Sequence, residues 1–199
     1  MRATLDGSVE LLDRALGYTR VQLGDVRDDL LDHPTPCADW HLGALLAHME
    51  DSLDAFTEAA GGAVELHPPA GAAGRVAVLQ DKACALMVAW SRPVPGDVVI
   101  RDDIGGLDLG SPLLVATAAL EITVHGWDVG QATGRRAPLP DELARALYPV
   151  AHRVVGPGDR GVRFDAARAT DPAGSYGVRL LAYLGRGCPG VGTPNRTRT

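Results

Sequence analysis

One stretch of the sequence, ALEITVHGWDVGQATG over residues 119–134, places ionisable side chains inside an otherwise apolar segment. On a helix with successive residues about 100° apart, His125 and Asp128 fall within about 40° of Glu121. All three therefore share the apolar face of the predicted helix. A buried carboxylate is costly unless it is paired or binds a metal, so Glu121 requires a partner in the fold.

The spacing of Glu121 and His125 indicates that this partner is a metal ion. Residues four apart lie one turn apart on the same helix face, so a carboxylate oxygen and an imidazole nitrogen can converge on one cation. Oxygen and nitrogen donors of this kind suit zinc or another borderline divalent metal. The alternative is that His125 is a hydrogen-bonded core residue, as most single histidines on apolar faces are.

A third ligand must come from another helix, and His48 in LGALLAHMEDS is the best candidate. It lies on the shoulder of its helix's apolar stripe, so spacing alone predicts it less strongly than Glu121 and His125. His41 lies seven residues earlier on nearly the same face. We expect His41 to line the mouth of the site, where it could transfer a proton.

Two further side chains have alternative interpretations. Asp128 either orients a ligand histidine by a hydrogen bond, or caps the helix or pairs with an arginine. We count it with His41 as a predicted catalytic residue. Cys37 lies in a proline-bounded loop before a helix N-terminus, where a thiol pKa can fall. It lacks a recognisable catalytic partner, so the sequence favours packing and leaves its role open.

The elements that must position these residues are helical. Apolar periodicity predicts four substantial helices, over residues 9–31, 41–60, 75–90 and 112–131. Shorter helices are expected over 141–154 and 175–184. The segments DVVIR and GLDLG flank a turn and predict a small hairpin or loop insertion before the fourth helix. The predicted fold is therefore all-α, an antiparallel four-helix bundle with short C-terminal helices.

Composition and charge narrow the class of protein. The chain has 199 residues, of which 46% are hydrophobic and 22% charged, and it carries a net charge of −6. This length predicts a single domain over residues 1–190, followed by a flexible tail over 191–199. The negative charge leaves no basic surface for nucleic acid or an anionic membrane. No apolar run is long enough to span a bilayer.

The cysteines and the N-terminus predict the compartment. Three widely spaced cysteines fit neither a disulfide framework nor a zinc ribbon. The first residues, MRATLDGSVELLDRAL, lack the apolar region of a signal peptide. A reducing cytoplasm is therefore the expected location.

The segments TPCADWHLGALLAHM and EITVHGWDVGQATG together resemble the DinB-like superfamily, specifically its actinobacterial branch related to mycothiol-dependent maleylpyruvate isomerase. The resemblance covers residues 9–186 and corresponds to the N-terminal domain of that isomerase. It implies a four-helix bundle with a metal, zinc in preference to nickel, held at His48, Glu121 and His125. One departure is local: relatives commonly begin the second helix with Ser or Thr, whereas this chain has His41, so we expect a hydroxyl N-cap to be lost.

The resemblance also implies a chemistry, because related proteins use mycothiol or a similar low-molecular-weight thiol. We expect an enzyme that binds this thiol and a small-molecule electrophile, and carries out sulfur transfer or isomerisation. A metal-dependent hydrolase and a non-catalytic metal-binding protein are the alternatives. A homodimer is one expected assembly, since helical bundles of this type often pair.

Overall fold

The computed structural model describes residues 2–37, 40–61, 71–92, 100–101, 108–161 and 163–187. The chain divides into two compact units, Met1–Pro138 and Leu139–Thr199. The single domain expected over residues 1–190 stays a prediction. The tail expected over 191–199 lies outside the described residues.

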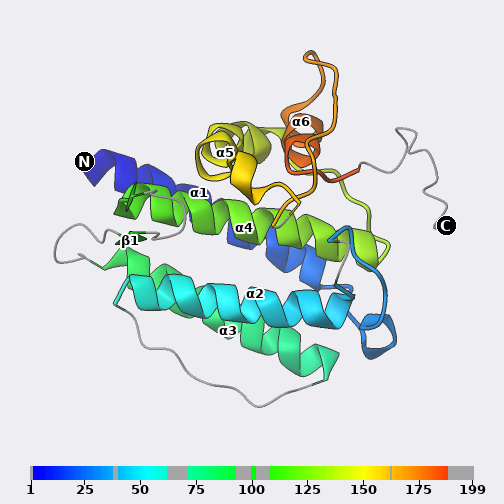
Figure 1. Cartoon of the computed structure of the whole chain (residues 1–199). Coiled ribbons are helices and arrows are strands. Elements are labelled where there is room, and N and C mark those ends of the chain that lie inside the picture. The colour runs from blue at the N-terminus through cyan, green and yellow to red at the C-terminus, as the bar shows by residue number, and fades with distance from the viewer. Residues whose placement is uncertain are drawn as a thin grey trace. The chain divides into compact units, whose positions relative to one another are not determined.

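The first unit is a four-helix bundle, which confirms the predicted all-α fold. Its helices are α1 (Arg2–Leu23), α2 (Leu42–Ala59), α3 (Ala72–Ser91) and α4 (Ser111–Ala132). α1 packs along α4 and α2 packs along α3, and contacts of α2 with α4 and of α1 with α3 close the bundle. Figure 1 shows that α1 and α4 run in one direction and that α2 and α3 run in the other. The antiparallel relation is therefore between the two pairs, whereas the two helices of each pair run parallel.

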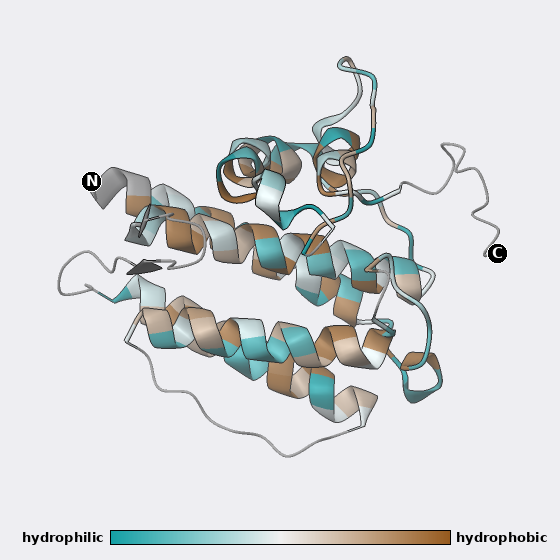
Figure 2. Ribbon diagram, viewed as in Figure 1, coloured by the Kyte–Doolittle hydropathy of each residue, from teal (hydrophilic) through white to brown (hydrophobic). Residues whose placement is uncertain are grey.

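α4 is largely buried, and nearly all of its residues between Leu114 and Ala132 are inaccessible to solvent. Hydrophilic segments nevertheless interrupt the hydrophobic ones along α1, α2 and α4 (Figure 2). Two glycines allow α1 to approach α4 closely: a side chain at Gly126 would meet Thr19, and one at Gly130 would meet Gln22. The Thr19 hydroxyl donates a 2.8 Å hydrogen bond to the Ile122 carbonyl across this contact.

The end of α1 differs from the predicted helix over 9–31. α1 ends at Leu23, and Asp28–Leu30 forms a separate 3₁₀ turn, η1. Gly24 is a poor helix former, and carboxylates are unfavourable at a helix C-terminus. Asp28 acts elsewhere instead: its Oδ1 accepts a 2.7 Å hydrogen bond from the Ala72 N–H at the start of α3. Leu30 still reaches the core and is buried.

The predicted hairpin is present between α3 and α4. Strands β1 (Ile100–Arg101) and β2 (Asp108–Leu109) pair antiparallel, with Ile100 opposite Leu109 and Arg101 opposite Asp108. The residues that connect the two strands lie outside the described ranges.

The second unit contains α5 (Asp141–Val154), a 3₁₀ turn η2 (Pro157–Asp159) and α6 (Tyr176–Tyr183). The two α-helices match the predicted ranges within a residue, and they pack against each other. Leu147 of α5 and Leu180 of α6 are completely buried. The Tyr183 hydroxyl donates a 2.8 Å hydrogen bond to the Val155 carbonyl. Among the described residues of the chain, no helix is long and apolar enough to cross a membrane.

Candidate metal centre

Three predicted ligands from two helices of the bundle come together. His48 extends from α2, and Glu121 and His125 extend from successive turns of α4. The Nε2 atoms of His48 and His125 lie 2.8 Å and 3.0 Å from the same carboxylate oxygen, Glu121 Oε1. One donor atom from each residue lies within 4.8 Å of the other two. This cluster joins residues 73 positions apart in the sequence.

The cluster is buried on one side and open on the other. The His125 side chain is 7% exposed, whereas those of His48 and Glu121 are 33% and 29% exposed. His125 is covered because α4 is buried on most of its circumference. Glu121, which is partly exposed, is also one of the residues that line a cavity.

Asp128 fixes the orientation of His125. It is fully buried, and its Oδ2 accepts a 3.1 Å hydrogen bond from His125 Nδ1. That bond turns the other ring nitrogen, Nε2, toward Glu121. The structure thus favours the first interpretation of Asp128, a carboxylate that orients a ligand histidine, and metal sites commonly use such a carboxylate.

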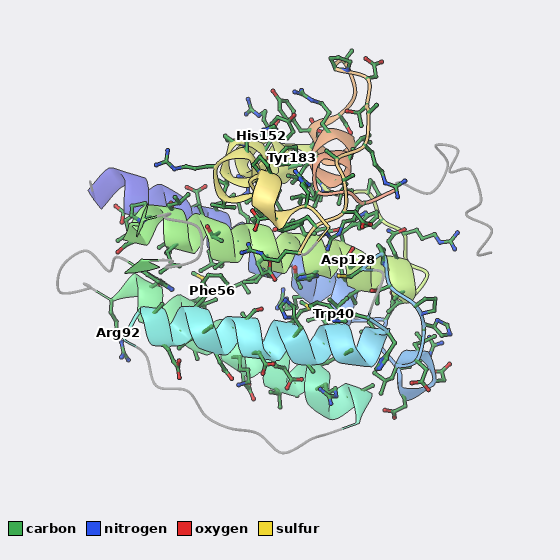
Figure 3. All side chains as sticks on the ribbon, in the orientation of Figure 1. Trp40, Phe56, Arg92, Asp128, His152 and Tyr183 are labelled. Atoms are coloured by element: carbon green, nitrogen blue, oxygen red, sulfur yellow. The ribbon has the colours of Figure 1, made fainter. Side chains whose placement is uncertain are left out.

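Trp40 covers both imidazoles, which sequence analysis did not anticipate. Its ring centroid lies 4.4 Å from that of His48 and 5.9 Å from that of His125. Figure 3 shows Trp40 and Asp128 near the end of the bundle where α2 begins and α4 ends. No spacing signal in the sequence links Trp40 to His125 of α4, because the two residues are far apart along the chain.

The charges of the cluster depend on one another. Burial alone would raise the pKa of the Glu121 carboxyl, but the charge of His125 and hydrogen bonds from both imidazoles hold it well below its usual range. Burial would likewise lower the pKa of His125, but the charge of Glu121 and hydrogen bonds with Asp128 and Glu121 raise it to about 9. At a pH below this value, His125 is protonated when no cation is bound, and cation binding would release that proton.

The donor set fits a divalent cation. Two imidazole nitrogens and one carboxylate oxygen are the protein ligands of many catalytic zinc sites, in which a further position stays open. The three atoms already converge, and Asp128 supplies the support that such a histidine ligand usually has. The roles of His48, Glu121 and His125 as ligands stay a prediction that metal analysis can test.

A cavity of about 890 Å³ adjoins the cluster and is lined by residues of all four helices of the bundle. Glu121 and His125 form part of its wall, and so does Ser52 of α2. This volume lies within the range of small-molecule sites. Most of the remaining wall is apolar and includes Leu16, Leu23, Met49, Leu53, Leu79 and Ile122.

His41 caps α2 with its imidazole, so the hydroxyl N-cap is absent as expected but the helix keeps a side-chain cap. Its Nδ1 accepts a 3.2 Å hydrogen bond from the Ala44 N–H, as a Ser or Thr hydroxyl would. The side chain is exposed, and His41 is not among the described residues that line the cavity. A role for His41 in proton transfer stays a prediction.

The bundle and its donor set define the class of protein, a helical bundle with a candidate metal site between its helices. The chain belongs to the mycothiol maleylpyruvate isomerase N-terminal domain family, whose model matches residues 12–130. This match includes His48, Glu121, His125 and Asp128, and it confirms the resemblance found in the sequence.

Two relatives come from Mycobacterium tuberculosis. They are the uncharacterized proteins Rv0738 of strain H37Rv and MT0763 of strain CDC 1551. Each is 28% identical to this chain over 187 residues, a match that covers 88% of this chain and 98% of the relative. No solved structure matches the chain significantly.

Asp128→Asn tests the support of His125. An amide can present its NH₂ group to His125 Nδ1, which would destabilise the orientation that turns Nε2 toward Glu121. We expect metal affinity to fall about 10- to 100-fold, the usual effect of losing such a support. Competition with a chromophoric chelator measures this change. Asp51→Asn, which replaces an exposed carboxylate on α2, is the control. Equal affinity in both variants would show that Asp128 does not support the site.

Proposed function

We propose that this protein is a metal-dependent enzyme that uses a low-molecular-weight thiol, mycothiol or a close analogue, to transfer sulfur to a small electrophile or to isomerise it. The carrying observation is that three donors converge and that two of the residues that bear them, Glu121 and His125, line a cavity large enough for small molecules. Membership of the isomerase domain family supports the thiol. Zinc is the preferred metal, and nickel is the alternative.

Each part of the site has a role in this proposal. His48, Glu121 and His125 would hold the cation, and Asp128 keeps the Nε2 of His125 directed at it. A bound divalent cation would lower the pKa of a thiol beside it, so that the reactive thiolate is present at neutral pH. The apolar cavity wall would bind the carbon framework of the electrophile close to Glu121.

The chemistry follows from the thiolate. Its sulfur forms a bond to an electrophilic carbon, and a leaving group departs with the electron pair of the bond that breaks. Alternatively, the sulfur adds to a conjugated double bond and departs again after rotation, which leaves the thiol unchanged. Both reactions require a site that holds thiol and substrate together, because orientation supplies much of the rate acceleration.

The test is conjugation of mycothiol to chlorodinitrobenzene and monobromobimane by zinc-loaded, nickel-loaded and metal-free protein. We expect conjugation above the uncatalysed rate only with metal and thiol present, and its loss in Glu121→Ala. Turnover of ester or amide substrates without thiol would instead identify a hydrolase. If neither reaction occurs and metal only raises the melting temperature, the protein binds metal without catalysis.

A further inference from the structure

Ser52 lies beside the open side of the cluster, and it is the polar group of the site that sequence analysis missed. It follows His48 by one turn of α2, and its Oγ lies 3.4 Å from His48 Nε2. It also lines the cavity together with Glu121 and His125. A hydroxyl therefore lies beside His48 and on the wall of the cavity that Glu121 and His125 also line.

The Ser52 hydroxyl is weakly held. A hydroxyl hydrogen bond normally spans about 2.5–3.0 Å between oxygens and somewhat more to nitrogen, so the 3.4 Å contact is long. His48 Nε2 already makes a 2.8 Å bond with Glu121 Oε1, and one ring nitrogen carries either one proton or one lone pair. Once Nε2 binds a cation, it has nothing left to offer Ser52.

Two other helix hydroxyls of the bundle, those of Thr57 and Thr117, make a different contact. Thr57 and Thr117 donate to the carbonyls four residues earlier, Leu53 and Leu113, at 2.8 Å and 2.7 Å. Such bonds to the preceding turn are the usual arrangement for a hydroxyl within a helix. Among the described residues, the contact of Ser52 is with the imidazole of His48 instead. The Ser52 hydroxyl is therefore directed at the ligand cluster and not at the backbone of its own helix.

Ser52 also carries the hydroxyl of the cavity wall that is available to a bound molecule. Among the described residues that line the cavity, Thr19 and Ser52 carry hydroxyl groups. Thr19 donates to the Ile122 carbonyl at 2.8 Å and holds α1 against α4. A bound molecule that needs a neutral donor near the cluster would meet Ser52.

We propose that the Ser52 hydroxyl donates a hydrogen bond to the sulfur of the thiol that binds at the open side of the cluster. This inference rests on the proposed function. A donor to an anionic acceptor stabilises its charged form, so Ser52 favours the thiolate over the thiol. His48 and Ser52 lie one turn apart on α2. In this arrangement the imidazole of His48 would bind the cation, and the hydroxyl of Ser52 would donate a hydrogen bond to the sulfur.

The test uses full-length protein loaded with cobalt(II), whose near-ultraviolet absorption reports a bound thiolate, titrated with mycothiol. We expect Ser52→Ala to keep its cobalt and to need roughly tenfold more thiol, since a hydrogen bond to a charged group is worth at least this factor. Ser52→Thr keeps a hydroxyl and should restore most of the affinity. Thr117→Ala, which removes a hydroxyl bonded to its own helix, should titrate like the wild type.

The outcomes separate this inference from the proposed function. Identical thiol affinity in Ser52→Ala and wild type would overturn the role of Ser52 and leave thiol binding at the metal intact. Loss of cobalt from Ser52→Ala would also overturn it, because Ser52 would then support the metal and not the sulfur. If the wild type itself binds cobalt but no thiol, the proposed function fails and the inference fails with it.

Discussion

Glu121→Ala is expected to abolish stoichiometric metal binding. Glu121 Oε1 is the atom on which both imidazoles converge, and it is the one anionic donor of the cluster. Its removal leaves two neutral donors and no charge to offset that of a divalent cation. We expect affinity to fall by more than the roughly 10- to 100-fold that follows the loss of a residue that only orients a ligand.

The measurement is elemental analysis of protein purified without a nickel column, followed by chelator competition. Wild-type protein should hold about one ion per chain, as expected for one three-ligand site. His41→Asn is the matched control, because asparagine keeps a helix N-cap and removes a histidine of the same helix as His48. Unchanged metal content in Glu121→Ala would show that the cluster is a set of hydrogen-bonded core residues.

Gly126→Ala is expected to destabilise the bundle, although alanine is the better helix former. A Cβ at this position would collide with Thr19 Oγ1 and come within 3.0 Å of Thr19 Cβ. Thr19 is buried and hydrogen-bonded to Ile122, so relief requires α1 to move away from α4 or this bond to break. Overpacking of this kind costs about 1–3 kcal/mol. Urea unfolding of the metal-free protein measures the loss.

Gly17→Ala is the control for this substitution. Gly17 is also inside a helix of the bundle, α1, but a Cβ there would meet nothing within 4 Å. Alanine at this position should stabilise the protein by about 0.5–1 kcal/mol, because glycine is unfavourable in a helix interior. Combining Gly126→Ala with Thr19→Ala should recover part of the lost stability, since the two changes share one contact. Destabilisation of equal size by Gly17→Ala would show that the contact between helices at Gly126 is not the cause of the stability lost in Gly126→Ala.

Local rules of helix geometry allowed the sequence by itself to determine much of this protein. A period of 3.6 residues places Glu121 and His125 one turn apart, whatever surrounds them. The same periodicity, with proline and glycine boundaries, located the helices of both units within a few residues, except for α1, which begins at Arg2, seven residues before the predicted start, and ends at Leu23, eight residues before the predicted end. Spacing alone predicted His48 only weakly, and its assignment depended on the family resemblance.

Only the tertiary structure decided which distant side chains meet. His48 reaches Glu121 across 73 residues of sequence because α2 packs on α4, and no local pattern encodes that distance. The same packing brings the Trp40 ring close to the imidazoles and places Ser52 on the wall of the cavity. The side chain of Asp128 could have capped its helix, but burial beside His125 left the imidazole as its partner. Helix periodicity depends on the backbone of one segment, whereas these contacts depend on how separate helices pack against one another.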